Sequence, residues 1–288
     1  KNMNGIVIIN KSKGYTSHDI VAKVKKITGE KVGHTGTLDP LATGVLPLLI
    51  GKGTLCSKYL MNHDKTYKVL LKLGIKKSTG DEEGEILQEE NVDKSTLEEQ
   101  NVNNVLNSFL GEQEQIPPIY SAIKVNGKKL YEYARKGQEV EIHPRKITIY
   151  DIQLLKIDKE NKEIQFEVSC SKGTYIRSLC EDIAKKIGTV GYMKELQRTK
   201  VGDFKIEQSV LTEDLKKETI EEHIITIEDL FQDMKNIELN ERKLQLFLNG
   251  VKLSVDLKDG IYKIYNNQQF IGIGMVKDKL LKRDIIIE

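Results

Sequence analysis

Residues 33–44 constrain the fold of this chain more than any other stretch, because their composition fits neither a helix nor a strand. Glycines, threonines, a histidine, an aspartate and a proline crowd into the run Gly-His-Thr-Gly-Thr-Leu-Asp-Pro-Leu-Ala-Thr-Gly. Such residues form turns and loops. The apolar residues 45–50 that follow have the length and composition of a buried strand. A polar loop that leads into a core strand is a place where a rigid scaffold can present reactive groups.

Asp39 lies in this loop and has two interpretations. The simpler one is a tight turn in which its carboxylate caps nearby backbone N–H groups, as aspartate often does. The other is a reactive carboxylate that the loop presents to a ligand. The residues elsewhere in the chain decide between them.

Length and composition limit the class of protein. A chain of 288 residues can form one large domain or two smaller ones. Its 39% hydrophobic and 31% charged residues are typical of a soluble globular protein. No stretch approaches the ~18 apolar residues of a membrane span, and the N-terminal residues show no signal-peptide pattern. We therefore expect a cytoplasmic protein.

The cysteine and histidine patterns indicate no metal chemistry. Cys56, Cys170 and Cys180 include no Cys-x-x-Cys pair, which disfavours both a disulfide framework and a structural zinc site. The histidines lack metal-binding spacing, and the sequence contains no nucleotide-binding loop motif. The sequence therefore shows no metal or nucleotide-cofactor signature.

Charge is unevenly distributed, although the formal net charge is only +2. Residues 1–77 contain fourteen lysines and four acidic residues, whereas residues 81–115 contain eleven acidic residues and one lysine. A basic N-terminal third suits a polyanionic partner. A solvated lysine-rich surface has the same composition, so charge alone leaves both open.

Hydrophobic periodicity and turn residues outline the secondary structure. Ser17 is expected to cap a helix that stops at Gly29, and Arg177 to lie at the start of a second helix. Residues 196–202 are expected to form a basic turn between a helix and a strand. The predicted strands are residues 5–10, 45–50 and 67–74, a hairpin over 146–157 and 162–170, and a compact β module over 260–287.

Residues 115–143 interleave tyrosines with lysines and arginines after a Pro-Pro pair. Tyrosines can stack on bases while the cations pair with phosphates, which suits RNA binding. An amphipathic hairpin with exposed tyrosines is the structural alternative.

Asp39, Tyr67 and Arg177 are the candidates for chemistry. If the segments that carry them converge, Arg177 would pair with Asp39 and keep it ionised by lowering its pKa. An ionised carboxylate without a second matching acid can act as a nucleophile or a base at an electrophilic carbon. Glycoside hydrolysis, by contrast, uses two carboxylates. Taken singly, each of the three residues also fits a structural role.

Together these residues belong to a series of motifs that resembles the TruB family of tRNA pseudouridine synthases. The run at 33–46 resembles the family's hallmark motif, and further matches follow in the family's order across about residues 4–232. These matches are Lys65-x-Tyr67, Thr79-x-Asp81-x-x-Gly84, Pro117-Pro118-x-Tyr120-Ser121-Ala122-x-Lys124, Tyr131-x-x-Ala134-Arg135-x-Gly137, Gly173-Thr174-Tyr175-Ile176-Arg177 and Leu196-x-Arg198-Thr199-x-x-Gly202.

The resemblance implies an α+β (mixed α/β) pseudouridine synthase fold, with a central mixed β-sheet flanked by helices. It implies a catalytic domain over residues 1–232, with a thumb-like RNA-binding insertion at about 115–143. A small β-rich PUA-like domain is expected over residues 237–288. The implied activity is isomerisation of uridine 55 in the T-loop of tRNA to pseudouridine by base flipping, without cofactor or metal.

Site residues are implied by the same resemblance. Asp39 matches the nucleophilic aspartate, Tyr67 the tyrosine that stacks on the target base, and Arg177 the arginine that pairs with the aspartate. Tyr175 and Leu196 match residues that hold the flipped base, and His34 matches the histidine that packs into the T-loop. Expected RNA contacts are Lys11, Lys124, Lys129, Arg135, Lys136 and Arg198.

The chain departs from the family pattern at two places. The family usually has Lys-Pro-x-Gly near the N-terminus, but this chain has Lys11-Ser12-Lys13-Gly14, which removes the fixed φ of proline from the turn. The tail beyond residue 237 is short, which leaves its RNA contact open.

Several functional alternatives remain at this point. One is a catalytically idle RNA-binding or tRNA-folding module on the same scaffold, and a tRNA-folding role could also accompany catalysis. A metal-dependent nuclease lacks clustered ligands in the sequence. Asp39 could attack C6 of the base, attack C1′ of the ribose, or remove the C2′ proton. No oligomer or protein partner is required, so we expect a monomer that binds the T-arm of tRNA.

Overall fold

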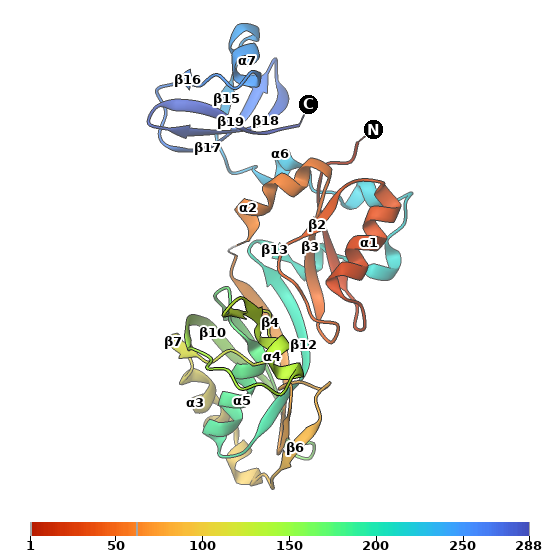
Figure 1. Cartoon of the computed structure of the whole chain (residues 1–288), viewed down its shortest axis with the longest axis vertical. Coiled ribbons are helices and arrows are strands. Elements are labelled where there is room, and N and C mark those ends of the chain that lie inside the picture. The colour runs from red at the N-terminus through yellow and green to blue at the C-terminus, as the bar shows by residue number, and fades with distance from the viewer. Residues whose placement is uncertain (1, 62, 288) are drawn as a thin grey trace.

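The computed structural model describes residues 2–61 and 63–287. A ten-stranded mixed sheet forms its main body (Figure 1). The strands of this sheet are β1 (Gly5–Lys11), β2 (Val32–His34), β3 (Thr43–Ile50), β4 (Lys65–Leu73), β7 (Gly111–Gln115), β10 (Arg145–Asp158), β11 (Glu163–Cys170), β12 (Gly191–Val201), β13 (Phe204–Lys205) and β14 (Val210–Leu211). Their order is β14-β1-β3-β12-β4-β11-β10-β7, with β2 added to β3 and β13 to β12.

Helices and small hairpins surround this sheet, except that the last helix packs on the sheet at the C-terminal end. The helices are α1 (Ser17–Thr28), α2 (Ser57–Leu60), α3 (Glu99–Asn107), α4 (Leu130–Arg135), α5 (Ile176–Ile187), α6 (Ile227–Leu230) and α7 (Glu241–Leu248). The hairpins pair β5 (Ile75–Lys77) with β6 (Ile86–Glu89), and β8 (Lys124–Val125) with β9 (Lys128–Lys129). The predicted mixed α/β fold with a central mixed sheet is confirmed.

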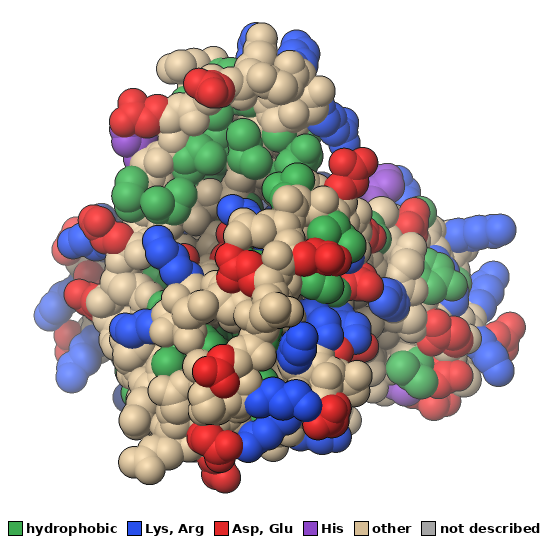
Figure 2. Space-filling model, turned by 90° about the horizontal axis from the view of Figure 1, so that it is seen from below, with side chains coloured by type: hydrophobic (Ala, Val, Ile, Leu, Met, Phe, Trp, Pro, Cys, Tyr) green, Lys and Arg blue, Asp and Glu red, His purple; other side chains and the backbone are tan. Residues whose placement is uncertain are grey.

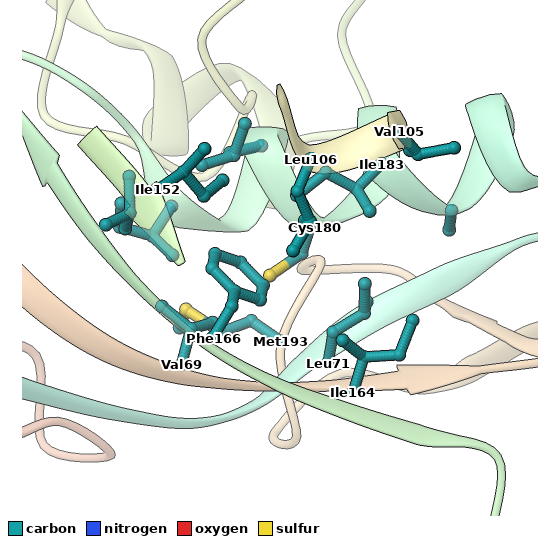
Figure 3. Packing of buried hydrophobic residues seen from close by; sticks show 14 of the residues in the cluster. Val69, Leu71, Val105, Leu106, Ile152, Ile164, Phe166, Cys180, Ile183 and Met193 are labelled. Atoms are coloured by element: carbon teal, nitrogen blue, oxygen red, sulfur yellow. The ribbon is translucent and has the colours of Figure 1, made fainter. Parts of the chain in front are cut away.

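Separate clusters of buried residues build the two halves of the sheet, two of them in the half that contains β1 and β3 and one in the other half. Val7 and Ile9 of β1 pack with Ile20 and Val24 of α1 in one half. In the other half, α3 and α5 cover β4, β10, β11 and β12 (Figure 1). Figure 3 shows Phe166 of β11 at the centre of the cluster in this half, facing α5. Alternate residues of β11 are buried, as expected for a strand with one covered face.

The two halves meet where β3 and β12 pair in parallel over only two positions, Gln197 with Thr43 and Arg198 with Gly44. Gly44 has a φ of 103°, and a Cβ there would lie 2.1 Å from the carbonyl oxygen of Arg198. Only glycine allows this close backbone approach. The junction of the halves therefore depends on the glycine that ends the loop at 33–44.

A five-stranded sheet follows at the C-terminal end. Its strands are β15 (Asn236–Glu238), β16 (Leu253–Ser254), β17 (Gly260–Asn266), β18 (Gln269–Lys277) and β19 (Leu280–Ile286), in the order β15-β17-β18-β19-β16. This sheet has a core of its own, centred on Phe247 and Ile264. The predicted β module of the tail is confirmed, while the domain limits at residues 232 and 237 stay a prediction. Within the described parts of the chain, no helix has the length and apolar character to cross a membrane.

Two local predictions were wrong. Residues 196–202 form the end of β12 and its turn into β13 rather than a turn after a helix, because β12 continues beside β4 through a register shift. The cap of α1 is Thr16, whose hydroxyl accepts from the Asp19 N–H, while the Asp19 carboxylate accepts from the Thr16 N–H. Ser17 does not cap the helix, and its hydroxyl forms hydrogen bonds with Leu38 in the loop at 33–44.

Candidate active site

A pocket of about 440 Å³ opens at the junction of the two half-sheets, within the roughly 300–1,000 Å³ typical of small-ligand sites. Separate segments bring five of the predicted site residues to its wall, namely Asp39, Tyr67, Tyr175, Arg177 and Leu196. The loop at 33–44, strands β4 and β12, and the start of α5 each contribute. The segments that carry Asp39, Tyr67 and Arg177 therefore do converge in the structure.

Backbone hydrogen bonds fix the loop on both sides of Asp39. The Ser17 hydroxyl donates to the Leu38 carbonyl at 3.0 Å and accepts from the Leu38 N–H at 2.9 Å. The Gly14 N–H donates to the Pro40 carbonyl at 2.8 Å, and the Ala42 N–H to the Asp39 carbonyl at 3.0 Å. Asp39 itself is exposed and lines the pocket. A rigid loop thus presents the carboxylate to whatever enters the pocket.

Lys11 and Arg198 were predicted to contact RNA, and the structure contradicts this for both. Lys11 is completely buried, and its ammonium donates to the carbonyls of Ser12, Tyr15 and Pro40 at 3.0, 2.7 and 3.4 Å. Arg198 is 1% exposed and donates to the carbonyls of Gly36 and Val45 at 2.8 and 2.9 Å. Inward-facing carbonyls need donors, and these two cations supply them around the loop.

Burial lowers the pKa of Lys11 from 10.5 to about 8, against the opposing effect of the nearby Asp39 and Asp19 carboxylates. The folded chain therefore releases this proton at lower pH than the unfolded chain. Between about pH 8 and 10.5 the unfolded state binds more protons, so this group makes the free energy of unfolding rise with pH in that window.

We expect the difference in unfolding free energy between the wild type and Lys11→Met to change across that window, in favour of the wild type as pH rises. Urea titrations at several pH values from 7 to 11 would measure it, and because both proteins share every other titrating group, the difference isolates Lys11. A difference that stays constant across these pH values would contradict the assigned pKa.

Arg177 has a different partner from the predicted one. Its guanidinium lies 3.9 Å from the Asp81 carboxylate and donates to the carbonyls of Thr79 and Tyr120 at 3.3 and 2.9 Å. Within the described residues, no ion pair joins Arg177 to Asp39. The buried Asp81 is held for this role by donors from the Thr79 hydroxyl at 2.6 Å and the Glu83 N–H at 3.1 Å.

Three predicted base-contacting residues have different surroundings. Tyr67 is 8% exposed, and its pKa is raised by burial, further raised by Asp39 and lowered by Arg198. The backbone of Tyr175 is clamped by the buried Gln115 amide, which accepts from its N–H at 2.8 Å and donates to its carbonyl at 3.0 Å. Leu196 is half-buried in β12 beside the pocket. Because its pKa is raised, the hydroxyl of Tyr67 remains protonated near neutral pH.

His34 is the one predicted substrate contact that does not line the pocket. It ends β2, is half-buried, and its Nδ1 has no hydrogen-bond partner in the described part of the chain. Burial, followed by the charges of Arg198 and His18, lowers its pKa. The lowered pKa favours the neutral form of the His34 imidazole at the start of the loop at 33–44.

The insertion at 115–143 lies over the pocket with its cations facing outward. Lys124, Arg135 and Lys136 are exposed, and Lys129 is half-buried. Lys129 and Arg135 lie 5.4 and 5.2 Å from the ring centre of Tyr131, a pocket residue. The face in Figure 2 carries Lys and Arg interspersed with Asp and Glu.

Four residues of the site had no assigned role in the sequence. Asp81 and Gln115 orient Arg177 and Tyr175, and Tyr131 lines the pocket. Ser121 also lines it, and its buried hydroxyl has no partner among the described residues. Asp81, Ser121 and Tyr131 belong to recognised motifs, which were the available signal, whereas nothing in the sequence marked Gln115.

Family models and nearly full-length relatives both relate this chain to pseudouridylate synthases. Residues 24–176 match the TruB family pseudouridylate synthase N-terminal domain, and residues 177–248 match the tRNA pseudouridylate synthase B C-terminal domain. The tRNA pseudouridine synthase B of Clostridium tetani is 47% identical over 94% of this chain and 95% of that protein. The protein of the same name from Clostridium perfringens is 45% identical over 99% of both chains.

Solved structures give the same fold. A Cbf5-Nop10-Gar1 complex contains a chain with a TM-score of 0.68 and 26% identity, covering 99% of this chain and 84% of that one. A chain in an H/ACA RNP bound to a substrate RNA containing 2′-deoxyuridine has a TM-score of 0.70 at 23% identity, with coverages of 99% and 85%, and this likeness bears on the fold alone. The chain therefore belongs to the TruB family of pseudouridylate synthases, enzymes that isomerise uridine in tRNA to pseudouridine.

Proposed function

We propose that this chain isomerises uridine 55 in the T-loop of tRNA, with Asp39 as the nucleophile. The observation that supports the proposal most is the convergence of Asp39, Tyr67, Tyr175, Arg177 and Leu196 on one pocket. The pocket admits a single extruded base, and its walls are aromatic and apolar around one exposed carboxylate.

Extrusion of the base is the first step. A uridine inside a folded T-loop is out of reach, so the nucleotide leaves its stack at a cost of about a few kcal/mol. Tyr67, Tyr175 and Leu196 offset this cost by enclosing the base. His34, which lies outside the pocket, enters the T-loop of the tRNA. The Ser121 hydroxyl offers the base an unused hydrogen bond.

The chemical step exchanges the C1′–N1 bond of the nucleotide for a C1′–C5 bond, with C5 losing a proton and N1 gaining one, so that the product is an isomer of the substrate. Asp39 acts by attack at C6 or C1′, or by removing the C2′ proton, and each route needs an ionised carboxylate facing the pocket. Arg177, on the same wall and held by Asp81, supplies positive charge near that carboxylate. Tyr67 is placed to stack on the base.

The insertion at 115–143 is proposed to grip the RNA backbone. Replacing Lys129, Arg135 and Lys136 with Gln should weaken tRNA binding and reduce the slope of log K against log salt by about 0.7–0.9 for each phosphate that is no longer neutralised. Filter binding at several salt concentrations measures both. Lys159→Gln, remote from the insertion, is the control, and an unchanged slope in the triple variant would mean that these cations do not touch phosphates.

The catalytic unit is proposed to span residues 1–232, which contain every residue that lines the pocket, and to act as a monomer. The sheet over residues 236–286, with its own core, is proposed as a separate PUA-like domain.

Mass-spectrometric mapping of pseudouridine on an unmodified tRNA transcript tests the assigned position. We expect modification at position 55, and none in a transcript with cytidine at that position. Modification at another uridine of the same tRNA would retain the activity but refute the assigned position.

A further inference from the structure

Arg198 is a buried cation that the chemistry described so far does not use. It is 1% exposed, and no carboxylate among the described residues forms an ion pair with it. Its Nε and Nη2 donate to the carbonyls of Val45 and Gly36. A guanidinium buried without a counter-ion is costly, so the structure must gain from having it there.

Tyr67 lies directly opposite Arg198 in the antiparallel β4–β12 pair, and both side chains are buried. Directly opposed residues of an antiparallel pair carry their side chains on the same face, which brings the hydroxyl and the guanidinium close enough for a hydrogen bond. A guanidinium has donors only, so the phenol oxygen is the acceptor. The phenolic hydrogen is thereby free to point away from Arg198 towards the pocket.

The loop around Asp39 is shaped to receive this guanidinium. Gly36 has a φ of 69°, and a Cβ there would lie 3.3 Å from Nη1 of Arg198, tighter than most side-chain contacts. Gly44 likewise admits the Arg198 backbone. Gly36 and Gly44 of the loop thus make room for Arg198.

We propose that Arg198 is a positioning residue for the reaction: it donates at once to the Tyr67 hydroxyl and to the Gly36 carbonyl, and so fixes the tyrosine relative to the Asp39 loop. This rests on the proposed place of Tyr67 against the target base. The guanidinium also opposes the increase that burial and Asp39 cause in the pKa of Tyr67. Its effect on the reaction therefore passes through the tyrosine oxygen.

A double-mutant cycle on single-turnover rates tests this. Arg198→Lys should lower the rate at saturating tRNA by about tenfold or more, with tRNA affinity changed by less than about threefold. In a Tyr67→Phe background the same substitution should cost less than about threefold, because the oxygen it acts through is gone. Equal losses in both backgrounds would overturn the proposal and leave Arg198 as a brace of the loop alone. Arg145→Lys, on the exposed start of β10, is the matched control.

A second measurement keeps Arg198 intact and so does not depend on whether its variants fold. In the folded protein, the side-chain N–H resonances of Arg198 should shift and exchange faster on Tyr67→Phe. Unchanged Arg198 resonances would overturn the proposed contact. Tyr67→Phe could instead shift these resonances and keep the wild-type rate. The contact would then stand, but the proposed role of Tyr67 at the base would fail, and with it the positioning role of Arg198.

Discussion

Asp39→Asn should reduce pseudouridine formation at least about 10⁴-fold, because an amide can neither attack carbon nor remove a proton. The substitution is nearly isosteric, and the loop is held by Ser17, Gly14 and Ala42 through backbone atoms that it does not alter. The fold and the pocket should therefore persist. Tritium release from C5-labelled tRNA measures the rate, and mass spectrometry of the tRNA confirms the product.

Binding separates chemistry from docking in this experiment. Affinity of Asp39→Asn for unmodified tRNA should stay within about threefold of the wild type, because the carboxylate acts on the reacting atoms rather than on the RNA backbone. Asp151→Asn, the same change at an exposed position of β10, should leave both rate and affinity unchanged. Modification by Asp39→Asn at even a tenth of the wild-type rate would refute the nucleophile assignment.

Much of the fold could be predicted from local signals. The alternation of β11 and the apolar runs of β1 and β3 are periodic over whole elements, and periodicity depends little on distant contacts. The strand at 196–202 was missed because its polar and basic residues resemble a turn. Its pairing with β3 and β4 is a tertiary contact that overrides local composition.

The site was predictable as a set of residues but not as a set of contacts. The motif order indicated that Asp39 and Arg177 share a pocket, yet the direct partner of Arg177 proved to be Asp81. Lys11 and Arg198 were expected to contact RNA, but both are buried. Sequence does not show which carbonyls face inward, and those carbonyls are what bury these two side chains.

The serine at the family's usual proline position has a structural explanation. The Ser12 N–H donates to the Thr212 hydroxyl at 3.4 Å, and the Ser12 hydroxyl donates to the Glu213 carboxylate at 2.7 Å. A proline could make neither bond, since it lacks the N–H and the hydroxyl. The turn that carries Lys11 is thus fixed by hydrogen bonds to residues 212–213 where a proline ring would otherwise restrict it.

Arg177→Met should lower the rate at saturating tRNA by about 10²–10³-fold, in the range for loss of one preorganised donor in a closed site. Arg177 joins three parts of the pocket, because it begins α5, pairs with Asp81 and donates to the Tyr120 carbonyl of the insertion. Its loss removes a positive charge from the wall of the pocket and breaks the hydrogen bond to the insertion. Arg177→Lys should recover little, since a single ammonium cannot reach these partners in the fixed geometry of a guanidinium.

Two comparisons show whether Arg177 acts at the chemical step. Arg135→Met, which removes an arginine from the outer face of the insertion, should weaken tRNA binding and leave the rate at saturation unchanged. Asp81→Asn should lower the saturated rate, and the double variant with Arg177→Met should be no slower than Arg177→Met alone, because Asp81 acts by holding the guanidinium. If Arg177→Met changed only the affinity for tRNA, Arg177 would be a binding residue and would have no part in the chemical step.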